Sequence, residues 1–71
     1  MRSLSDPLKI ALTPREYQIA TLRAEGLRLK EIALKLNVSY STVNNHLYFV
    51  YDKLGVHNVA QLAAKLGLLN S

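Results

Sequence analysis

The strongest constraint on the fold of this chain is the short stretch "LNVS" at residues 36–39, which separates two segments of helical periodicity. The segment before it repeats apolar side chains at the spacing of one helix face: Ile32, Ala33 and Leu36. The longer segment after it has an apolar stripe at i, i+4, i+7 and i+11: Val43, Leu47, Val50 and Leu54. Two helices joined so closely, with the second one longer and amphipathic, are typical of a helix-turn-helix.

Cap residues define a first helix ahead of this pair. Thr13 is a good N-cap, Pro14 suits the first helical turn, and Glu16 completes a capping box with Thr13. Leu12 is placed to pack against this first turn, and Gly26 ends the helix. The apolar stripe of this helix consists of Leu12, Ile19 and Leu22.

Further cap positions fix the ends of the remaining helices. Asn37 ends the second, short helix, and Ser39 caps a third helix that is expected over residues 40–54. Gly55 closes the third helix. Asn58 then caps a fourth helix, "VAQLAAKLGLL", which is rich in alanine.

The chain divides into an arm and one domain. Residues 1–11 are mixed in character and are broken by Asp6-Pro7, so they are interpreted as an N-terminal arm. Residues 12–71 are predicted to form an all-α, four-helix helix-turn-helix domain with no sheet. A domain of this size buries only about 60% of the surface that its unfolded chain exposes, which leaves no room for a deep enzyme cleft.

The charge of the chain favours an anionic partner. The sequence has 9 Lys and Arg against 5 Asp and Glu, for a net charge of +4, and a pI of about 9.7. This balance suits nucleic acid first and an acidic membrane second, with a merely soluble basic surface as the alternative. No signal peptide and no apolar run of the ~18 residues of a transmembrane helix is present in the sequence.

No arrangement of residues predicts catalysis. Ser39, Ser41 and His46 are close in sequence, but helix capping and helical phase explain all three. There is no Gly-rich phosphate loop and, without cysteine, no disulfide, zinc finger or thiol nucleophile. His57 is the only other imidazole, so no metal site and no cofactor are expected. The chain is predicted not to be an enzyme.

Several segments together resemble a known family. They are "LTPRE" at the start of the first helix, "EGL" at its end, "KEIALKLNVSYSTVNNHL" across the turn, and "KLGV" followed by "QLA" beyond it. In this order and spacing, over residues 12–66, they are similar to the LuxR/FixJ/GerE-type helix-turn-helix domain, the DNA-binding unit of many bacterial transcription regulators. Region four of sigma factors shares part of the pattern, but the "KLGV" segment and the fourth helix argue against it.

The resemblance implies that the third helix enters the major groove and that the fourth helix commonly mediates dimerisation. Carried over by position, it implies four base-contacting residues: Ser41, Asn44, Asn45 and Tyr48. Helical phase agrees, because these side chains fall opposite the apolar stripe or on the flank of that face. Surplus apolar residues on the fourth helix favour a dimer interface, with plain core as the alternative, at Val59, Leu62, Ala63 and Leu66.

The third helix departs from the family pattern in its charge. Family members usually carry Lys or Arg at the positions of Ser41 and Asn44, and often a basic residue where Asp52 stands. Near the second helix, Arg28 and Leu29 replace the usual Ser and Asn or Lys. Neutral groups still recognise bases, since an Asn amide pairs with adenine N6 and N7. They attract phosphate poorly, however, and phosphate attraction dominates affinity.

Phosphate contacts are therefore expected at the periphery of the third helix. The predicted contacts are Arg28, Lys30, Thr42, His46 and Lys53, with Arg15, Arg23 and Lys35 as further peripheral cations. For His46, a packed and hydrogen-bonded histidine is the preferred role, and the phosphate contact comes second. Asp52 is expected to pair with a cation, Tyr51 to join the core and Phe49 to be partly covered.

These observations predict a sequence-specific, duplex-DNA-binding transcription regulator of the bacterial cytoplasm, with residues 40–54 in the major groove. Its expected partners are double-stranded DNA, a second copy of the chain and RNA polymerase, and not a membrane. The alternative function is a protein-interaction module of the same fold, which binds a protein partner rather than an operator. Met1 and the end at Ser71 favour a complete small protein over a fragment of a longer regulator, and both remain open.

Overall fold

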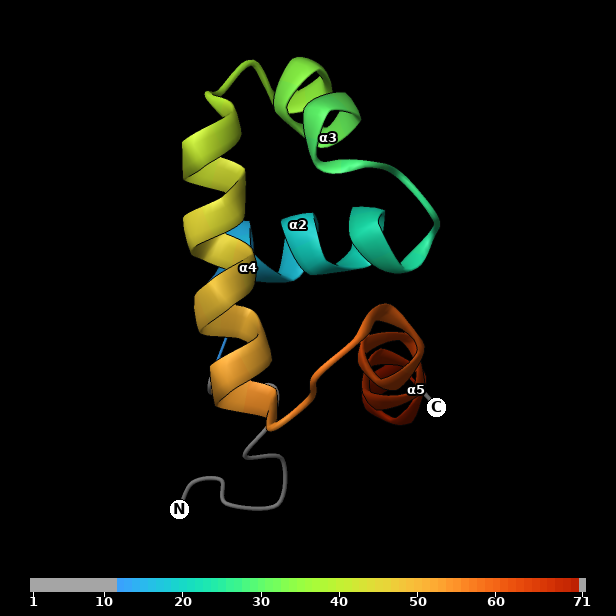
Figure 1. Cartoon of the computed structure of the whole chain (residues 1–71). Helices are drawn as coiled ribbons and strands as arrows, with labels where there is room; N and C mark the ends of the chain where they lie inside the picture. The colour runs from blue at the N-terminus through green and yellow to red at the C-terminus, as the bar shows by residue number, and fades with distance from the viewer. Residues whose placement is uncertain (1–11, 71) are drawn as a thin grey trace.

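The computed structural model describes the backbone of residues 12–70 and the side chains of residues 12–67. Over this range the chain forms four helices and no strand (Figure 1): α2 (Pro14–Ala24), α3 (Leu29–Leu36), α4 (Tyr40–Leu54) and α5 (Val59–Asn70). The predicted all-α fold class is confirmed, and the predicted arm lies outside the described residues. None of the described helices has the length and hydropathy needed to cross a lipid bilayer.

The helices α2 and α5 begin at the predicted caps. Thr13 Oγ1 accepts the Glu16 N–H at 3.1 Å, and Glu16 Oε1 accepts the Thr13 N–H at 2.9 Å, so both halves of the predicted capping box are formed. At the start of α5, Asn58 Oδ1 accepts the Gln61 N–H at 2.9 Å. Each cap satisfies a backbone N–H that the first helical turn leaves without an intrahelical acceptor.

The turn between α3 and α4 is tight because a stop signal and a start signal follow each other closely. Asn37 adopts the left-handed conformation, with φ 58° and ψ 47°, which ends α3. The Val38 N–H donates back to the Ala33 carbonyl at 3.0 Å. Ser39 Oγ then accepts the Thr42 N–H at 3.1 Å and starts α4. The predicted helix-turn-helix is therefore formed by local hydrogen bonds and backbone conformation. Figure 1 shows α3 beside the N-terminal end of α4.

The helices enclose two adjoining hydrophobic clusters. The first cluster joins α2, α3 and the N-terminal half of α4: Ile19, Ile32, Ala33, Val43 and Leu47. The second cluster joins α2, the C-terminal half of α4 and α5. It also includes Leu12, which precedes α2, and Val56, which precedes α5; its other members are Ala20, Val50, Leu54, Leu62 and Leu66. Tyr51 packs against both clusters, as predicted. The stripe of α4 thus lies inside the core along its whole length, and the opposite face of the helix is left outside.

The dimer interface predicted on α5 has to be corrected for two of its four residues. Leu62 is fully buried and Leu66 is only 4% exposed, both within the second cluster of the monomer. An apolar side chain that is buried against its own chain has no surface left to offer a second copy. The plain-core alternative is therefore right for Leu62 and Leu66, whereas Val59 is half-buried and Ala63 is exposed.

Candidate nucleic-acid interface

One face of α4 lies on the surface of the domain. Its side chains are all exposed: Ser41, Asn44, Asn45, Tyr48 and Asp52. They lie opposite or beside the buried stripe because an α-helix turns by about 100° per residue. Neither amide of Asn44 and Asn45 forms a hydrogen bond with another residue in the described part of the chain, while Ser41 Oγ lies 3.2 Å from Ser39 Oγ. The four predicted base-contacting residues therefore share one surface, and their contacts with DNA stay a prediction.

A shallow hollow of about 300 Å³ adjoins this face on one side. Asn44 and Tyr48 of α4 line it together with Arg23 of α2 and Leu29 of α3. Arg23 Nη1 donates to the Leu27 carbonyl at 2.7 Å, which fixes the guanidinium at the loop between α2 and α3. Arg23 was expected only among the peripheral cations, and the fold brings it beside two predicted base-contacting residues.

The start of α3 adds two more cations to this side. Arg28 and Lys30 are exposed, and they flank Leu29, which lines the same hollow. The Arg28 N–H donates to Glu31 Oε1 at 2.7 Å, so the backbone of Arg28 begins the helix and its guanidinium is not used in the cap. Arg23 lines the hollow itself, and Arg28 and Lys30 are expected to lie along the same edge of the exposed face of α4 because they adjoin Leu29 in the sequence. This group is named the basic edge.

Two aromatic rings stand out on the surface of α4. Tyr48 is 70% exposed and Phe49 is 51% exposed. Their ring centroids are 5.6 Å apart, and the planes meet at 74° in an edge-to-face arrangement. Phe49 was predicted to be partly covered, but it is an exposed side chain. Its ring contacts the Tyr48 ring and restrains the direction of that ring.

The opposite edge of the face carries the other predicted phosphate contacts. Thr42, His46 and Lys53 fall on one line along α4, at i, i+4 and i+11. His46 Nδ1 lies 2.7 Å from the Thr42 carbonyl, and the side chain is half-buried, so the preferred role of a packed, hydrogen-bonded histidine is confirmed. A bond to this carbonyl requires the proton on Nδ1, which leaves Nε2 as an acceptor in the neutral ring. Only the imidazolium form of His46 is therefore able to donate to a phosphate.

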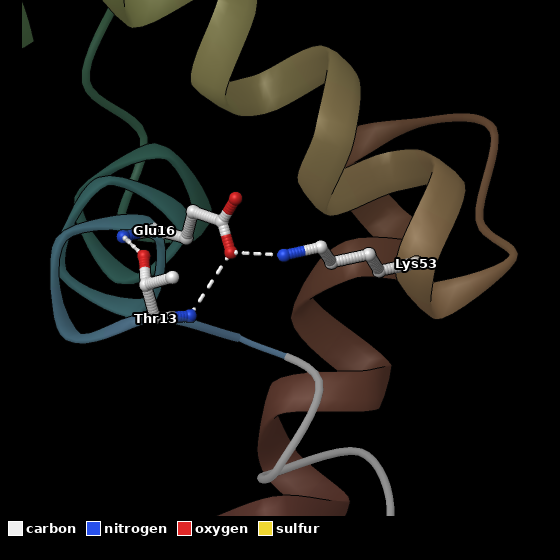
Figure 2. Close-up of polar contacts among 3 residues, drawn as sticks. All are labelled: Thr13, Glu16 and Lys53. Atoms are coloured by element: carbon white, nitrogen blue, oxygen red, sulfur yellow. Dashed lines mark hydrogen bonds and ion pairs between the residues drawn. The ribbon is translucent and has the colours of Figure 1, made fainter.

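Lys53 is engaged within the protein. Its Nζ lies 2.7 Å from Glu16 Oε1, the same oxygen that accepts the Thr13 N–H (Figure 2). The Glu16 side chain is 9% exposed and that of Lys53 is 34% exposed. The pair joins the first turn of α2 to the last turn of α4, 37 residues away in the sequence. Glu16 was predicted as a cap residue and Lys53 as a phosphate contact, and no local sequence signal connects the two.

The ionisation of Glu16 is set by opposing effects. Burial disfavours the charged carboxylate and raises its pKa, whereas the hydrogen bond from Lys53 and that from the Thr13 backbone lower it. The lowering effects together outweigh the burial, so the pKa of Glu16 lies below its ordinary value. The carboxylate of Glu16 is therefore ionised at neutral pH, and it neutralises the ammonium of Lys53. The cations of the basic edge form no ion pair with a carboxylate among the described residues, so the two edges of the exposed face differ in charge.

The remaining predicted charges lie elsewhere. Arg15 and Lys35 line a separate hollow of about 630 Å³ between α2 and α3, which no residue of α4 borders. Asp52 forms no ion pair within residues 12–67, so the predicted cation partner is wrong for that part of the chain. No cluster of three or more His, Cys, Asp or Glu side chains able to hold a metal occurs there either.

An exposed helix that follows a tight turn, with amides on its free face and cations at its border, defines a protein of the helix-turn-helix class. Residues 10–66 match the family described as "Bacterial regulatory proteins, luxR family". The chain therefore belongs to the luxR family of bacterial regulatory proteins, a family of DNA-binding transcription regulators and not of enzymes.

Two relatives illustrate the extent of the similarity. The chain is 44% identical to the transcriptional regulatory protein UhpA of Escherichia coli over 55 residues. This matched stretch covers 78% of this chain and 28% of the relative. The chain is 36% identical to the response regulator UvrY of Escherichia coli over 64 residues, and this matched stretch covers 86% of this chain and 29% of the relative. The chain thus spans less than a third of the length of either relative. No solved structure matches it.

Proposed function

We propose that this chain recognises duplex DNA by sequence, with α4 in the major groove, as the operator-binding part of a bacterial, cytoplasmic transcription regulator. The observation that carries this proposal is the division of α4 into a fully buried stripe and an opposite face of exposed amide, hydroxyl and phenol groups. The major groove is about 12 Å wide and admits a single α-helix. No described element covers the exposed face, so α4 is free to enter the groove.

The roles proposed for the side chains follow from their places on α4 and at its borders. Ser41, Asn44, Asn45 and Tyr48 contact the edges of bases. Phosphates on one side of the groove meet the basic edge, next to the N-terminus of α3, where the helix dipole also favours an anion. Phosphates on the other side meet Thr42, His46 and Lys53. Because Glu16 neutralises Lys53, the basic edge supplies most of the phosphate attraction.

A second copy of the chain is proposed to bind through α5. Because Leu62 and Leu66 are in the core, the proposed dimer contact consists of the other two predicted residues, Val59 and Ala63, which lie one helical turn apart. Their exposed neighbours are small and allow a close approach of two helices: Ala60, Ala64 and Gly67. A two-fold dimer presents two copies of α4 to two half-sites. RNA polymerase is a further proposed partner, because a transcription regulator acts on the enzyme that starts transcription.

The dependence of binding on salt tests the proposed function. A duplex recovered by random-site selection is titrated with the whole chain at increasing salt concentration. The slope of log K against log salt is expected to correspond to about 3–6 phosphates per protomer, because each neutralised phosphate releases counterions. A flat response to salt contradicts DNA binding and favours the protein-interaction module, whose aromatic interface is insensitive to screening.

A further inference from the structure

The exposed face of α4 has hydrogen-bonding groups but no cation. No Lys or Arg occurs between Ser39 and Asp52. Guanine presents two acceptors, N7 and O6, in the major groove, and the forked donors of Arg or Lys bind them best. Arg23 lines the hollow beside this face, but its bond to the Leu27 carbonyl at 2.7 Å holds the guanidinium at the α2–α3 loop. The face is therefore poorly suited to guanine.

The amide of Asn45 has the complementary chemistry for adenine. Asn45 lies in the middle of the exposed face, and its amide has no hydrogen-bonding partner within residues 12–67. The amide offers one donor group and one acceptor group side by side. Adenine offers the matching pair in the major groove, the N7 acceptor and the N6 amino donor. A single Asn side chain thus satisfies both groups of one adenine.

Tyr48 presents an apolar ring beside this amide. It lies three residues after Asn45, which places the two side chains next to each other on the helix surface. The ring is 70% exposed, and Phe49 meets it edge-to-face at a centroid distance of 5.6 Å. The 5-methyl group of thymine is the apolar group that a base pair displays in the major groove. An exposed ring whose direction is restrained by its neighbour is therefore suited to cover a thymine methyl.

We propose that α4 recognises an A·T-containing half-site, in which the Asn45 amide binds adenine and the Tyr48 ring packs on the methyl group of a neighbouring thymine. This inference rests on the proposed binding of duplex DNA and specifies the base pairs that are bound.

Single-atom changes in the DNA test the proposal. The half-site recovered by random-site selection is prepared with each thymine replaced in turn by deoxyuracil, which lacks only the methyl group. At one thymine we expect the affinity of the whole chain to fall about fourfold, because the complex with deoxyuracil no longer buries a methyl group. With each adenine replaced in turn by 7-deazaadenine, which lacks N7, we expect a loss of about fivefold or more at a neighbouring position.

Three variants assign the methyl effect to the ring of Tyr48. Tyr48→Ala should bind the thymine and uracil sites equally, whereas Tyr48→Phe, which keeps the ring, should retain the difference. Tyr40→Ala removes another exposed tyrosine, at the start of the same helix and off the exposed face, and should also retain it. A site that binds specifically but is indifferent to every methyl and every adenine N7 overturns this proposal and leaves DNA binding intact. Failure to bind any duplex overturns the proposed function itself.

Discussion

Glu16 links two parts of the fold through one carboxylate oxygen. It accepts the Thr13 N–H at 2.9 Å and the Lys53 ammonium at 2.7 Å. The two partners of the ion pair differ in their access to water, because the Lys53 side chain is 34% exposed and that of Glu16 is 9% exposed. Removing one partner or the other should therefore have unequal effects on the free energy of unfolding.

We predict that Lys53→Met destabilises the fold more than Glu16→Gln. After Lys53→Met the buried carboxylate loses its cation, which costs about 2–4 kcal/mol. After Glu16→Gln the freed ammonium turns to water and the amide oxygen still accepts the Thr13 N–H, so the cost is about 1–2 kcal/mol. Chemical denaturation at neutral pH measures both values. If the two substitutions lower the free energy of unfolding equally, or in the reverse order, the buried position of the Glu16 carboxylate is not what makes the pair important.

Acid should remove the contribution of Glu16. The pKa of Glu16 is lowered in the folded chain from an ordinary value of 4.5, so the carboxylate stabilises the fold fully above that pH. This contribution is lost as the pH falls through the folded pKa, because the proton neutralises the group that Lys53 and Thr13 bind. The difference in stability between the parent chain and Glu16→Gln is expected to shrink steadily below pH 4.5. A difference that stays constant down to about pH 2 contradicts the lowered pKa.

At the scale of helices, local chemistry made most of the fold predictable. The capping box of Thr13 and Glu16, the stop at Asn37, the Ser39 cap and the Asn58 cap all act within a few residues. The stripe of α4 was equally predictable, because periodicity shows which side of a helix is apolar. Periodicity does not show what that side packs against, which is why a dimer interface was favoured over plain core for Leu62 and Leu66. The Lys53–Glu16 pair and the position of Arg23 beside Asn44 depend on tertiary packing, so no sequence spacing encoded them.

The proposed α5 contact gives a prediction at this scale. Ala63→Glu should leave helix content unchanged by circular dichroism, because the side chain is exposed. It should reduce cooperative binding to DNA with two half-sites by about tenfold or more, since like charges then face each other across a two-fold contact. Gln18→Glu on α2 is the matched control, which makes the same change in net charge at an exposed position that lines the hollow between α2 and α3. Equal effects of the two substitutions on cooperative binding would show that α5 is not the dimer contact. The same conclusion follows if the chain sediments as a monomer and Ala63→Glu does not change its binding to two-site DNA.

At the scale of the whole molecule, recognition and attraction are carried by different surfaces. Within residues 12–67, the Lys and Arg side chains lie off the exposed face of α4, on the basic edge and at more distant positions such as Arg15 and Lys35. The face itself has neutral groups and Asp52. Such a separation implies that base preference and overall affinity are changed independently by substitution, because phosphate contacts position the helix and base contacts specify the sequence.

The most direct test of this account compares Asn45→Ala with Lys30→Ala on the best site and its single-base variants, titrated at several salt concentrations. Asn45→Ala should flatten the preference at one position, with a loss of about 1–3 kcal/mol of discrimination. Lys30→Ala should weaken all sequences nearly equally and lower the salt slope by about one unit. If Asn44→Ala and Asn45→Ala each leave both preference and affinity unchanged, α4 does not recognise DNA through its neutral face, and the account is contradicted.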